Sequence, residues 1–117
     1  MTDSKSTPEK PALSPAALEL VARRFRVLSL PLRLQLLQEL FPGELTVQEL
    51  CKRTGASQPS VSKHLSLMTQ EGLLARRQQG SFAFYEIFDP SVFELCRLVC
   101  GSLAERFEEA SAEFRSA

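Results

Sequence analysis

The sequence lacks the features that mark membrane and exported proteins. Across its 117 residues, no apolar run approaches the roughly 18 residues that a membrane-spanning helix requires. The N-terminal segment "MTDSKSTPEKPALSP" has no apolar core of the kind that directs export. These absences predict a cytoplasmic protein that does not enter a membrane.

The sequence also has no net charge, only three cysteines and a single histidine. The 14 basic and 14 acidic side chains cancel, which argues against a general binder of polyanions, although residues 46 to 88 carry five basic and three acidic side chains. Three cysteines without a secretory context predict reduced thiols rather than a disulfide framework. The only histidine, His64, is expected on a helix flank without an orienting group, so we expect no enzyme.

The remaining composition is that of one ordinary domain. Hydrophobic residues make up 44% of the chain, which is enough for a packed core. Residues 1–13 are polar and contain two prolines, and we predict a disordered tail there. Residues 14–117 are predicted to form a single domain.

Helix start and stop signals divide this domain. Ser14 as N-cap and Pro15 predict the start of a first helix, whose apolar residues recur at helical spacing up to Leu28. Pro31 opens a second helix, "PLRLQLLQELF", and the segment "PGE" at residues 42–44 ends it.

Two further helices are predicted to be joined by a tight turn. Thr46 and Glu49 form a capping box at the head of "VQELCKRTG", in which Gly55 suits the left-handed position after the last turn. Only "ASQ" separates this helix from the next one, which is expected from near Gln58 to Glu71. This spacing is typical of a helix-turn-helix.

The second of these helices begins with the serine-rich stretch "SQPSVSKHLSLM". At about 100° per residue, Val61, Leu65 and Met68 face the core, and the outer face carries serines, Gln58 and Lys63. Short side chains let a helix enter the major groove, which is roughly 12 Å wide, and hydroxyl, amide and ammonium groups can bind phosphates or base edges. Serine and lysine are also common on an ordinary solvated face, but the neighbouring elements favour a DNA-reading helix.

A hairpin is predicted directly after the helix-turn-helix. Residues 74–79 and 82–88 are two extended runs around Gly80-Ser81, a common pair for a two-residue turn. The expected register pairs Gln79 with Phe82, Arg77 with Phe84 and Arg76 with Tyr85. An arginine-bearing hairpin in this place is a wing.

The last helix is expected to begin at Asp89-Pro90, with Pro90 as its first helical residue. Its apolar side chains repeat at heptad-like spacing, at Val92, Cys96, Val99, Leu103, Phe107, Ala110 and Phe114. A helix this long on a small domain needs a cover for its apolar side. We therefore predict a two-fold dimer formed through the first and last helices.

Three motifs resemble the ArsR/SmtB family of bacterial winged-helix repressors over roughly residues 20–100. They are "LPLRLQLLQEL", "SQPSVSKHLSLMTQEGLL" and "RRQQGSFAFYEI". The resemblance implies a mainly α fold with a small β-hairpin, a winged helix-turn-helix of about five helices. It also implies a homodimer that binds an inverted-repeat operator in double-stranded DNA and is released by a metal ion, metalloid or oxidant. With the serine at the helix start included, the candidate DNA-binding residues are Ser57, Gln58, Ser60, Ser62, Lys63, His64, Arg76 and Arg77.

The chain departs from the family pattern at the two usual metal sites. Thr46 and Gln48 occupy the positions where metal-sensing members carry Cys-x-Cys, and Asp89-Pro90-Ser91 replaces the Asp-x-His of members that bind zinc on the last helix. The wing tip is Gly80-Ser81-Phe82, where a cation often follows the glycine. We expect neither of these metal sites here.

Thiols are the remaining candidates for an effector site. Cys96 and Cys100 are four residues apart on the last helix, and soft thiolates are the ligands that arsenite and similar ions select. A trigonal site would take a third sulfur from another element, for which Cys51 is a candidate. The opposing interpretation is that these cysteines only pack in the core, as free cysteines commonly do.

The sequence thus predicts a dimeric, sequence-specific DNA-binding regulator, a repressor that a thiol-reactive metalloid, metal or oxidant could release. Two alternatives stay open: a winged-helix module that binds protein, and a repressor of the same fold with no effector site.

Overall fold

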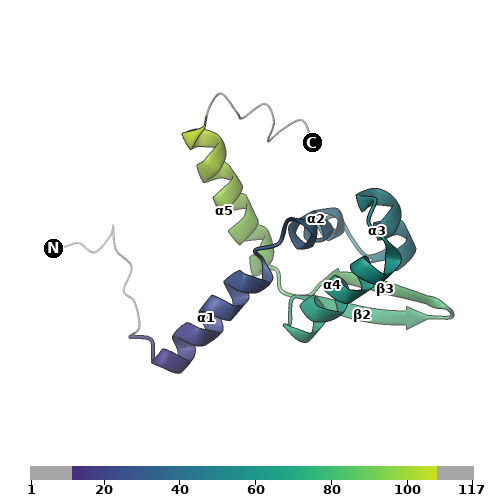
Figure 1. Cartoon of the computed structure of the whole chain (residues 1–117), viewed down its shortest axis with the longest axis horizontal. Coiled ribbons are helices and arrows are strands. Elements are labelled where there is room, and N and C mark those ends of the chain that lie inside the picture. Colours follow the sequence, from purple (N-terminus) through teal and green to yellow (C-terminus); the bar gives the residue numbers. More distant parts are fainter. Residues whose placement is uncertain (1–11, 108–117) are drawn as a thin grey trace.

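The computed structural model describes residues 12–107. This part of the chain forms five helices and three strands, shown in Figure 1. In chain order they are α1 (Pro15–Val27), α2 (Pro31–Leu40), β1 (Leu45–Thr46), α3 (Val47–Thr54), α4 (Gln58–Gln70), β2 (Leu74–Gln79), β3 (Phe82–Ile87) and α5 (Ser91–Arg106). The predicted fold class, mainly α with a small hairpin, is confirmed.

The helix caps follow the local sequence. Ser14 Oγ accepts a hydrogen bond from the Ala17 amide at 3.1 Å. At the head of α3, Thr46 Oγ1 accepts from the Glu49 amide at 3.1 Å, and Glu49 Oε1 accepts from the Thr46 amide at 2.8 Å, which completes the capping box. Gly55 ends α3 with φ 77°, a conformation that costs glycine little. The predicted boundaries of these helices hold to within about a residue because capping is a short-range effect.

The core lies between α2, α3, α4 and the inner face of the sheet. Its largest fully buried side chains are Leu36, Leu37, Leu40, Leu50, Val61, Leu65, Met68, Leu73 and Val92. Each such side chain contributes about 1.5–3 kcal/mol relative to an exposed one. This packing holds α4 in place although serine is a poor helix former.

The sheet has three antiparallel strands in the order β1-β3-β2. In the hairpin, Gln79 pairs with Phe82, Arg77 with Phe84 and Arg76 with Tyr85, so the predicted register is confirmed. The strand β1 was not predicted: its two residues pair with β3 and are too few to give an alternating pattern.

The predicted start of the last helix is wrong by one residue. The helix begins at Ser91, and Pro90 is its N-cap rather than its first helical residue. The physical reason is the side chain of Asp89, whose Oδ1 accepts from the Ser91 amide at 3.0 Å and closes a turn ahead of the helix. Two of the seam positions predicted for this helix, Ala110 and Phe114, lie outside the described residues, as does most of the predicted tail.

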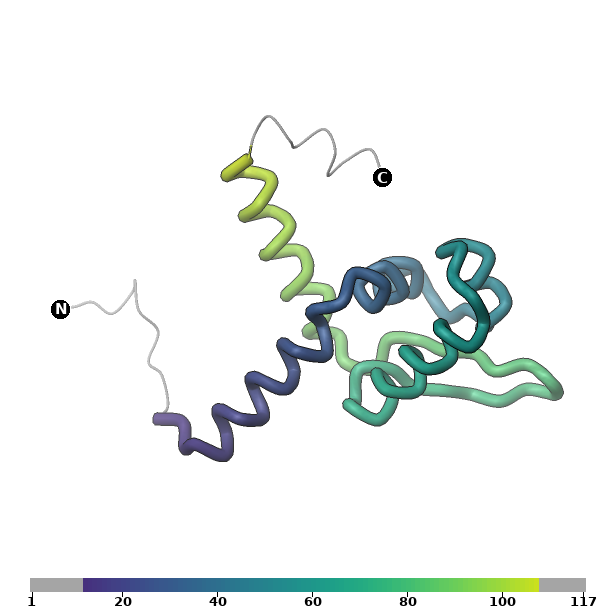
Figure 2. The backbone as a smooth tube through the Cα atoms, viewed as in Figure 1, coloured from purple at the N-terminus to yellow at the C-terminus, as the bar shows by residue number. Residues whose placement is uncertain are grey.

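Helices α1 and α5 project from the compact body and diverge from a common base, as Figures 1 and 2 show. Side chains at their bases join them: Arg24 of α1 binds Asp89 Oδ2 at 3.1 Å and also donates to the Glu71 carbonyl at the end of α4. Among the described residues, no helix is both long and apolar enough to span a membrane.

Candidate nucleic-acid interface

Helix α4 presents a polar face to solvent. Its three apolar residues Val61, Leu65 and Met68 are completely buried, as the helical spacing predicts. Ser57 caps the helix by accepting from the Ser60 amide at 3.4 Å, and the first turn contains no acidic residue. The positive end of the helix dipole therefore meets no negative side chain of its own, an arrangement that favours binding of an anion such as phosphate.

The predicted contact residues of α4 lie on or beside this polar face. Ser57, Gln58 and Lys63 are exposed, and Ser60, Ser62 and His64 are half-buried. Lys63 is the only cationic side chain that α4 carries. The rest of the face offers hydroxyl and amide groups, which can pair with base edges as well as with phosphate.

His64 has a partner that sequence reasoning missed. Arg33, in α2, donates from Nε to His64 Nδ1 at 3.0 Å and from a terminal nitrogen to the Val27 carbonyl at 3.1 Å. Burial, followed by the positive charges of Arg33 and Lys63, lowers the pKa of His64. The imidazole is therefore neutral near pH 7. The two residues are 31 positions apart, and the only signal in the sequence was the arginine within "LPLRLQLLQEL".

The two arginines of the wing differ in their surroundings. They are neighbours on β2, so their side chains leave opposite faces of the hairpin. Arg77 forms an ion pair with Glu44 at 2.7 Å, and its guanidinium lies 4.5 Å from the centre of the Phe84 ring. Arg76 is exposed and bonded only to Gln78, at 2.7 Å, within the described residues. Arg76 is thus the more available cation. Tyr85, across the hairpin, is buried in the core.

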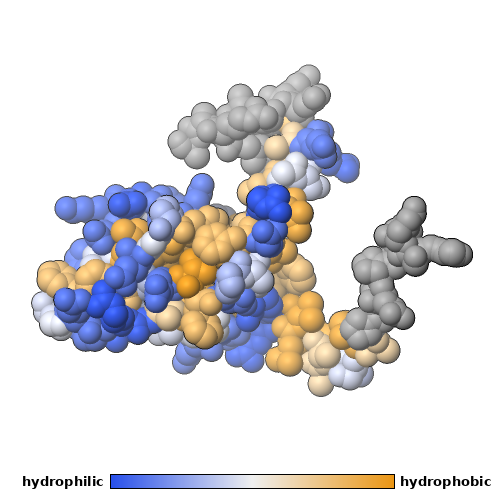
Figure 3. Space-filling model, turned by 180° about the vertical axis from the view of Figure 1, so that it is seen from behind, coloured by the Kyte–Doolittle hydropathy of each residue, from blue (hydrophilic) through white to orange (hydrophobic). Residues whose placement is uncertain are grey.

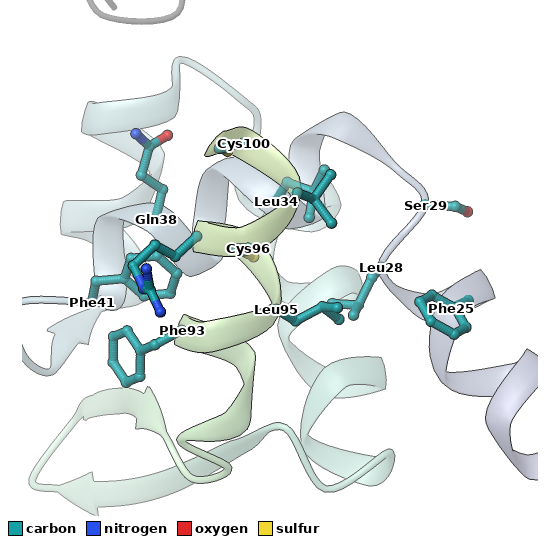
Figure 4. Close-up of a pocket in the computed structure, with 12 residues that line it drawn as sticks. Phe25, Leu28, Ser29, Leu34, Gln38, Phe41, Phe93, Leu95, Cys96 and Cys100 are labelled. Carbon is teal, nitrogen blue, oxygen red and sulfur yellow. The ribbon is translucent and has the colours of Figure 1, made fainter. Parts of the chain in front are cut away.

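The thiols of Cys96 and Cys100 are brought together and that of Cys51 is not. Cys96 and Cys100 lie one turn apart on α5 and line an open apolar groove of about 670 Å³ between α1, α2 and α5 (Figure 4). At one side of the groove the rings of Phe41 and Phe93 pack with their centres 4.4 Å apart. Burial raises the pKa of Cys96, so the protonated thiol is its resting form. Cys51 is half-buried on α3 and does not line the groove.

Apolar side chains of α1 and α5 remain exposed outside the body. Figure 3 shows apolar surface continuing from the body onto both projecting helices. The large apolar side chains that are exposed in the predicted seam and along α1 include Leu18, Val21, Phe25, Val99, Leu103 and Phe107. Between residues 12 and 107, no group of three potential ligands among His, Cys, Asp and Glu is placed to hold a metal ion.

These features define a winged helix-turn-helix DNA-binding protein. They are the helix-turn-helix of α3 and α4, the wing of β2 and β3 that follows it, and the free polar face of α4. The family model for bacterial regulatory proteins of the arsR family matches residues 31–76. The chain is 39% identical over 98 residues to the probable mercury resistance operon repressor of Streptomyces lividans, covering 84% of this chain and 76% of that protein. The chain therefore belongs to the arsR family and is a DNA-binding transcriptional regulator, as the sequence motifs predicted.

Solved structures agree with this fold. The AntR antimony-specific transcriptional repressor superposes with a TM-score of 0.78 at 26% identity, covering 92% of this chain and 98% of that one. The homodimeric winged helix-turn-helix domain of Mb0332 from Mycobacterium bovis gives 0.72 at 30% identity, covering 86% and 95%. Membership of a regulator family also favours DNA binding over the alternative of a protein-binding module.

Proposed function

We propose that the protein is a homodimeric repressor that binds an inverted-repeat operator, with α4 of each subunit in the major groove. The observation that carries the proposal is the division of α4: Val61, Leu65 and Met68 are fully buried, and the opposite face is polar and free. A helix held only from behind can enter a groove without losing its packing. In this position Gln58 and the serines would face base edges, and Lys63 and Arg76 would face phosphates or bases.

The dimer follows from the exposed apolar residues of α1 and α5. A second copy related by a two-fold axis would cover these residues on both subunits with the same surface. It would also present two α4 helices to successive major-groove segments, about 34 Å apart on one side of the duplex. The homodimeric Mycobacterium bovis relative supports a homodimer.

The DNA-binding part of the proposal is tested with Lys63→Ala. Loss of one phosphate contact should weaken binding to the operator and reduce the salt dependence of the affinity by about one in log–log slope per subunit. Fluorescence anisotropy between about 50 and 200 mM salt measures both quantities. The matched control is Arg26→Ala, which removes one exposed positive charge from α1 rather than from α4. Equal slopes for the two variants would contradict the docking of α4.

We also propose that the repressor is released by a thiophilic metalloid or metal bound through Cys96 and Cys100. The two thiols are neighbours in an open groove, and relatives named for mercury and antimony support an effector of this class. A third ligand would come from the second subunit, since residues 12–107 of one chain contain no group of three suitable side chains.

The thiol proposal predicts the response of the double variant Cys96→Ser, Cys100→Ser. Arsenite, antimonite or Hg²⁺ should release the wild-type repressor from DNA and leave the double variant bound. Cys51→Ser is the control and should respond as the wild type does, because its thiol lies outside the groove. Hydrogen peroxide is included to detect an oxidative signal. Release of the double variant by every agent would disprove the role of these thiols.

A further inference from the structure

Arg33 lies in α2, outside the helix-turn-helix, and contacts His64 of α4. The guanidinium of Arg33 reaches two acceptors at once: His64 Nδ1 at 3.0 Å and the carbonyl of Val27, the last residue of α1, at 3.1 Å. Both acceptors are fixed, one on α4 and one at the end of a helix whose last carbonyls have no partner within the helix. The planar guanidinium spans them without rearrangement.

This contact determines which ring nitrogen of His64 carries the proton. A nitrogen that accepts a hydrogen bond from Arg33 must keep its lone pair, so Nδ1 is unprotonated and Nε2 holds the hydrogen. A protonated ring would direct an N–H group at the guanidinium. The charges that face the ring are Arg33 from α2 and Lys63 from α4, and both oppose protonation.

The Nε2–H group is left available. Within the described residues, the side chain of His64 makes one hydrogen bond, in which Nδ1 accepts from Arg33. The side chain is half-buried at the edge of the polar face of α4. We propose that Arg33 is a positioning residue for DNA binding: it orients the neutral ring of His64 so that Nε2–H donates to an acceptor of the operator. This inference rests on the proposed docking of α4.

Arg33→Lys separates positioning from charge. Lysine keeps the positive charge, but its side chain is shorter and ends in one compact ammonium group. It therefore cannot bind both acceptors in the way that the planar guanidinium does. We expect about tenfold weaker operator binding in this variant, the scale of one hydrogen bond to a charged group. If Arg33 acted only through its charge, the affinity would be unchanged and the proposal would be wrong.

A double-mutant cycle tests whether Arg33 acts through His64. In the His64→Ala background, Arg33→Lys should cost less than about twofold, because the ring that it positions is absent. The same loss in both backgrounds would overturn the proposal and would indicate that Arg33 contacts DNA itself or only supports the end of α1. Thermal unfolding and sedimentation of each variant confirm that the compared proteins are folded and in the same oligomeric state.

A measurement without DNA keeps this inference separate from the proposed function. The chain has one histidine, so ¹⁵N-histidine labelling gives NMR signals from a single imidazole ring. In the wild type we expect a protonated Nε2 and a pKa below the usual range, and in Arg33→Gln a pKa shifted upward towards it. An unchanged pKa in Arg33→Gln would disprove the contact. If the pKa of His64 rises in Arg33→Gln as expected but the wild-type protein fails to bind DNA, the proposed function would be disproved instead. The role of Arg33 in binding would be disproved with it.

Discussion

Asp89 links the start of α5 to two other helices. Its Oδ1 accepts from the amide and the hydroxyl of Ser91 at 3.0 and 2.7 Å, and its Oδ2 accepts from Arg24 at 3.1 Å. Arg24 in turn binds the Glu71 carbonyl at the end of α4. The hydrogen bonds from Ser91, and then the contact with Arg24, lower the pKa of Asp89. The carboxylate is therefore ionised at neutral pH and supports the junction of α1, α4 and α5.

Replacing Asp89 by alanine should lower the free energy of unfolding by about 1–2 kcal/mol, because it removes the hydrogen bonds from Ser91 and the contact with Arg24. The control is Glu94→Ala on the same helix, which removes an exposed ion pair with Arg97 that is worth about 0.5 kcal/mol or less. Urea denaturation followed by circular dichroism measures both values. Equal losses in the two variants would mean that Asp89 acts only as a surface charge.

Residues whose roles depend on near neighbours could be predicted from the sequence. Ser14, Thr46 and Ser57 were identified as caps or as part of the candidate surface because each acts within about three positions of itself. Arg33 could not be linked to His64 in this way, since their contact joins two helices through the fold. The same applies to Glu44, which meets Arg77 across 33 positions.

At the scale of elements, the two faces of the wing have different properties. On one face, the guanidinium of Arg77 forms an ion pair of 2.7 Å with Glu44, which neutralises its charge, and lies over the ring of Phe84. Arg76 is on the opposite face, which is also the side of the sheet that carries the buried Tyr85. Of the two wing arginines, Arg76 is therefore the one without an ion pair among the described residues, and it lies on the side of the sheet that faces the core.

Arg76→Ala should weaken operator binding and lower the salt slope by about one per subunit, whereas Arg77→Ala should have the smaller effect on both. The physical reason is that Arg77 would first have to leave Glu44. The two variants are controls for each other, since each removes one arginine from adjacent positions of β2. Anisotropy titrations at several salt concentrations measure the difference, and a larger loss for Arg77→Ala would show that the Glu44 pair opens on binding.

The elements themselves were largely predictable, with exceptions that have a common cause. Periodicity, caps and turn residues located the five helices and the register of the hairpin. The strand β1 exists because β3 is there to pair with it, and α5 starts one residue late because of the side chain of Asp89. These features depend on tertiary contacts, which patterns along the chain do not contain.

At the scale of the whole molecule, the apolar sides of α1 and α5 require a partner. Val99 is 49% exposed and Phe25 is 56% exposed, although both belong to apolar stripes that the sequence pattern assigned to packing. Contiguous apolar surface of this kind marks an interaction site on a soluble protein. The sequence thus predicted both the stripes and the need for a second subunit to cover them, whereas the fold was needed to show which of their residues are exposed in one subunit.

Val99→Glu should shift the protein from dimer to monomer, with a dissociation constant raised by at least about tenfold, because the carboxylate would be buried without a partner. The control is Glu105→Lys, a charge change of the opposite sign on the other side of α5, which should leave the dimer intact. Sedimentation velocity across micromolar concentrations measures both. The Val99→Glu variant should also bind the operator more weakly, and a stable dimer of it would place the interface elsewhere.

The ion pair between Glu44 and Arg77 bears on how the regulator finds its target site among unrelated DNA. Because the chain has no net charge and one wing cation is neutralised by an ion pair, we expect weak general attraction to the polyanionic backbone. Fewer copies would then be sequestered on unrelated DNA, and a larger share would remain free in solution. Occupancy of the target site would respond directly to how many molecules the cell makes.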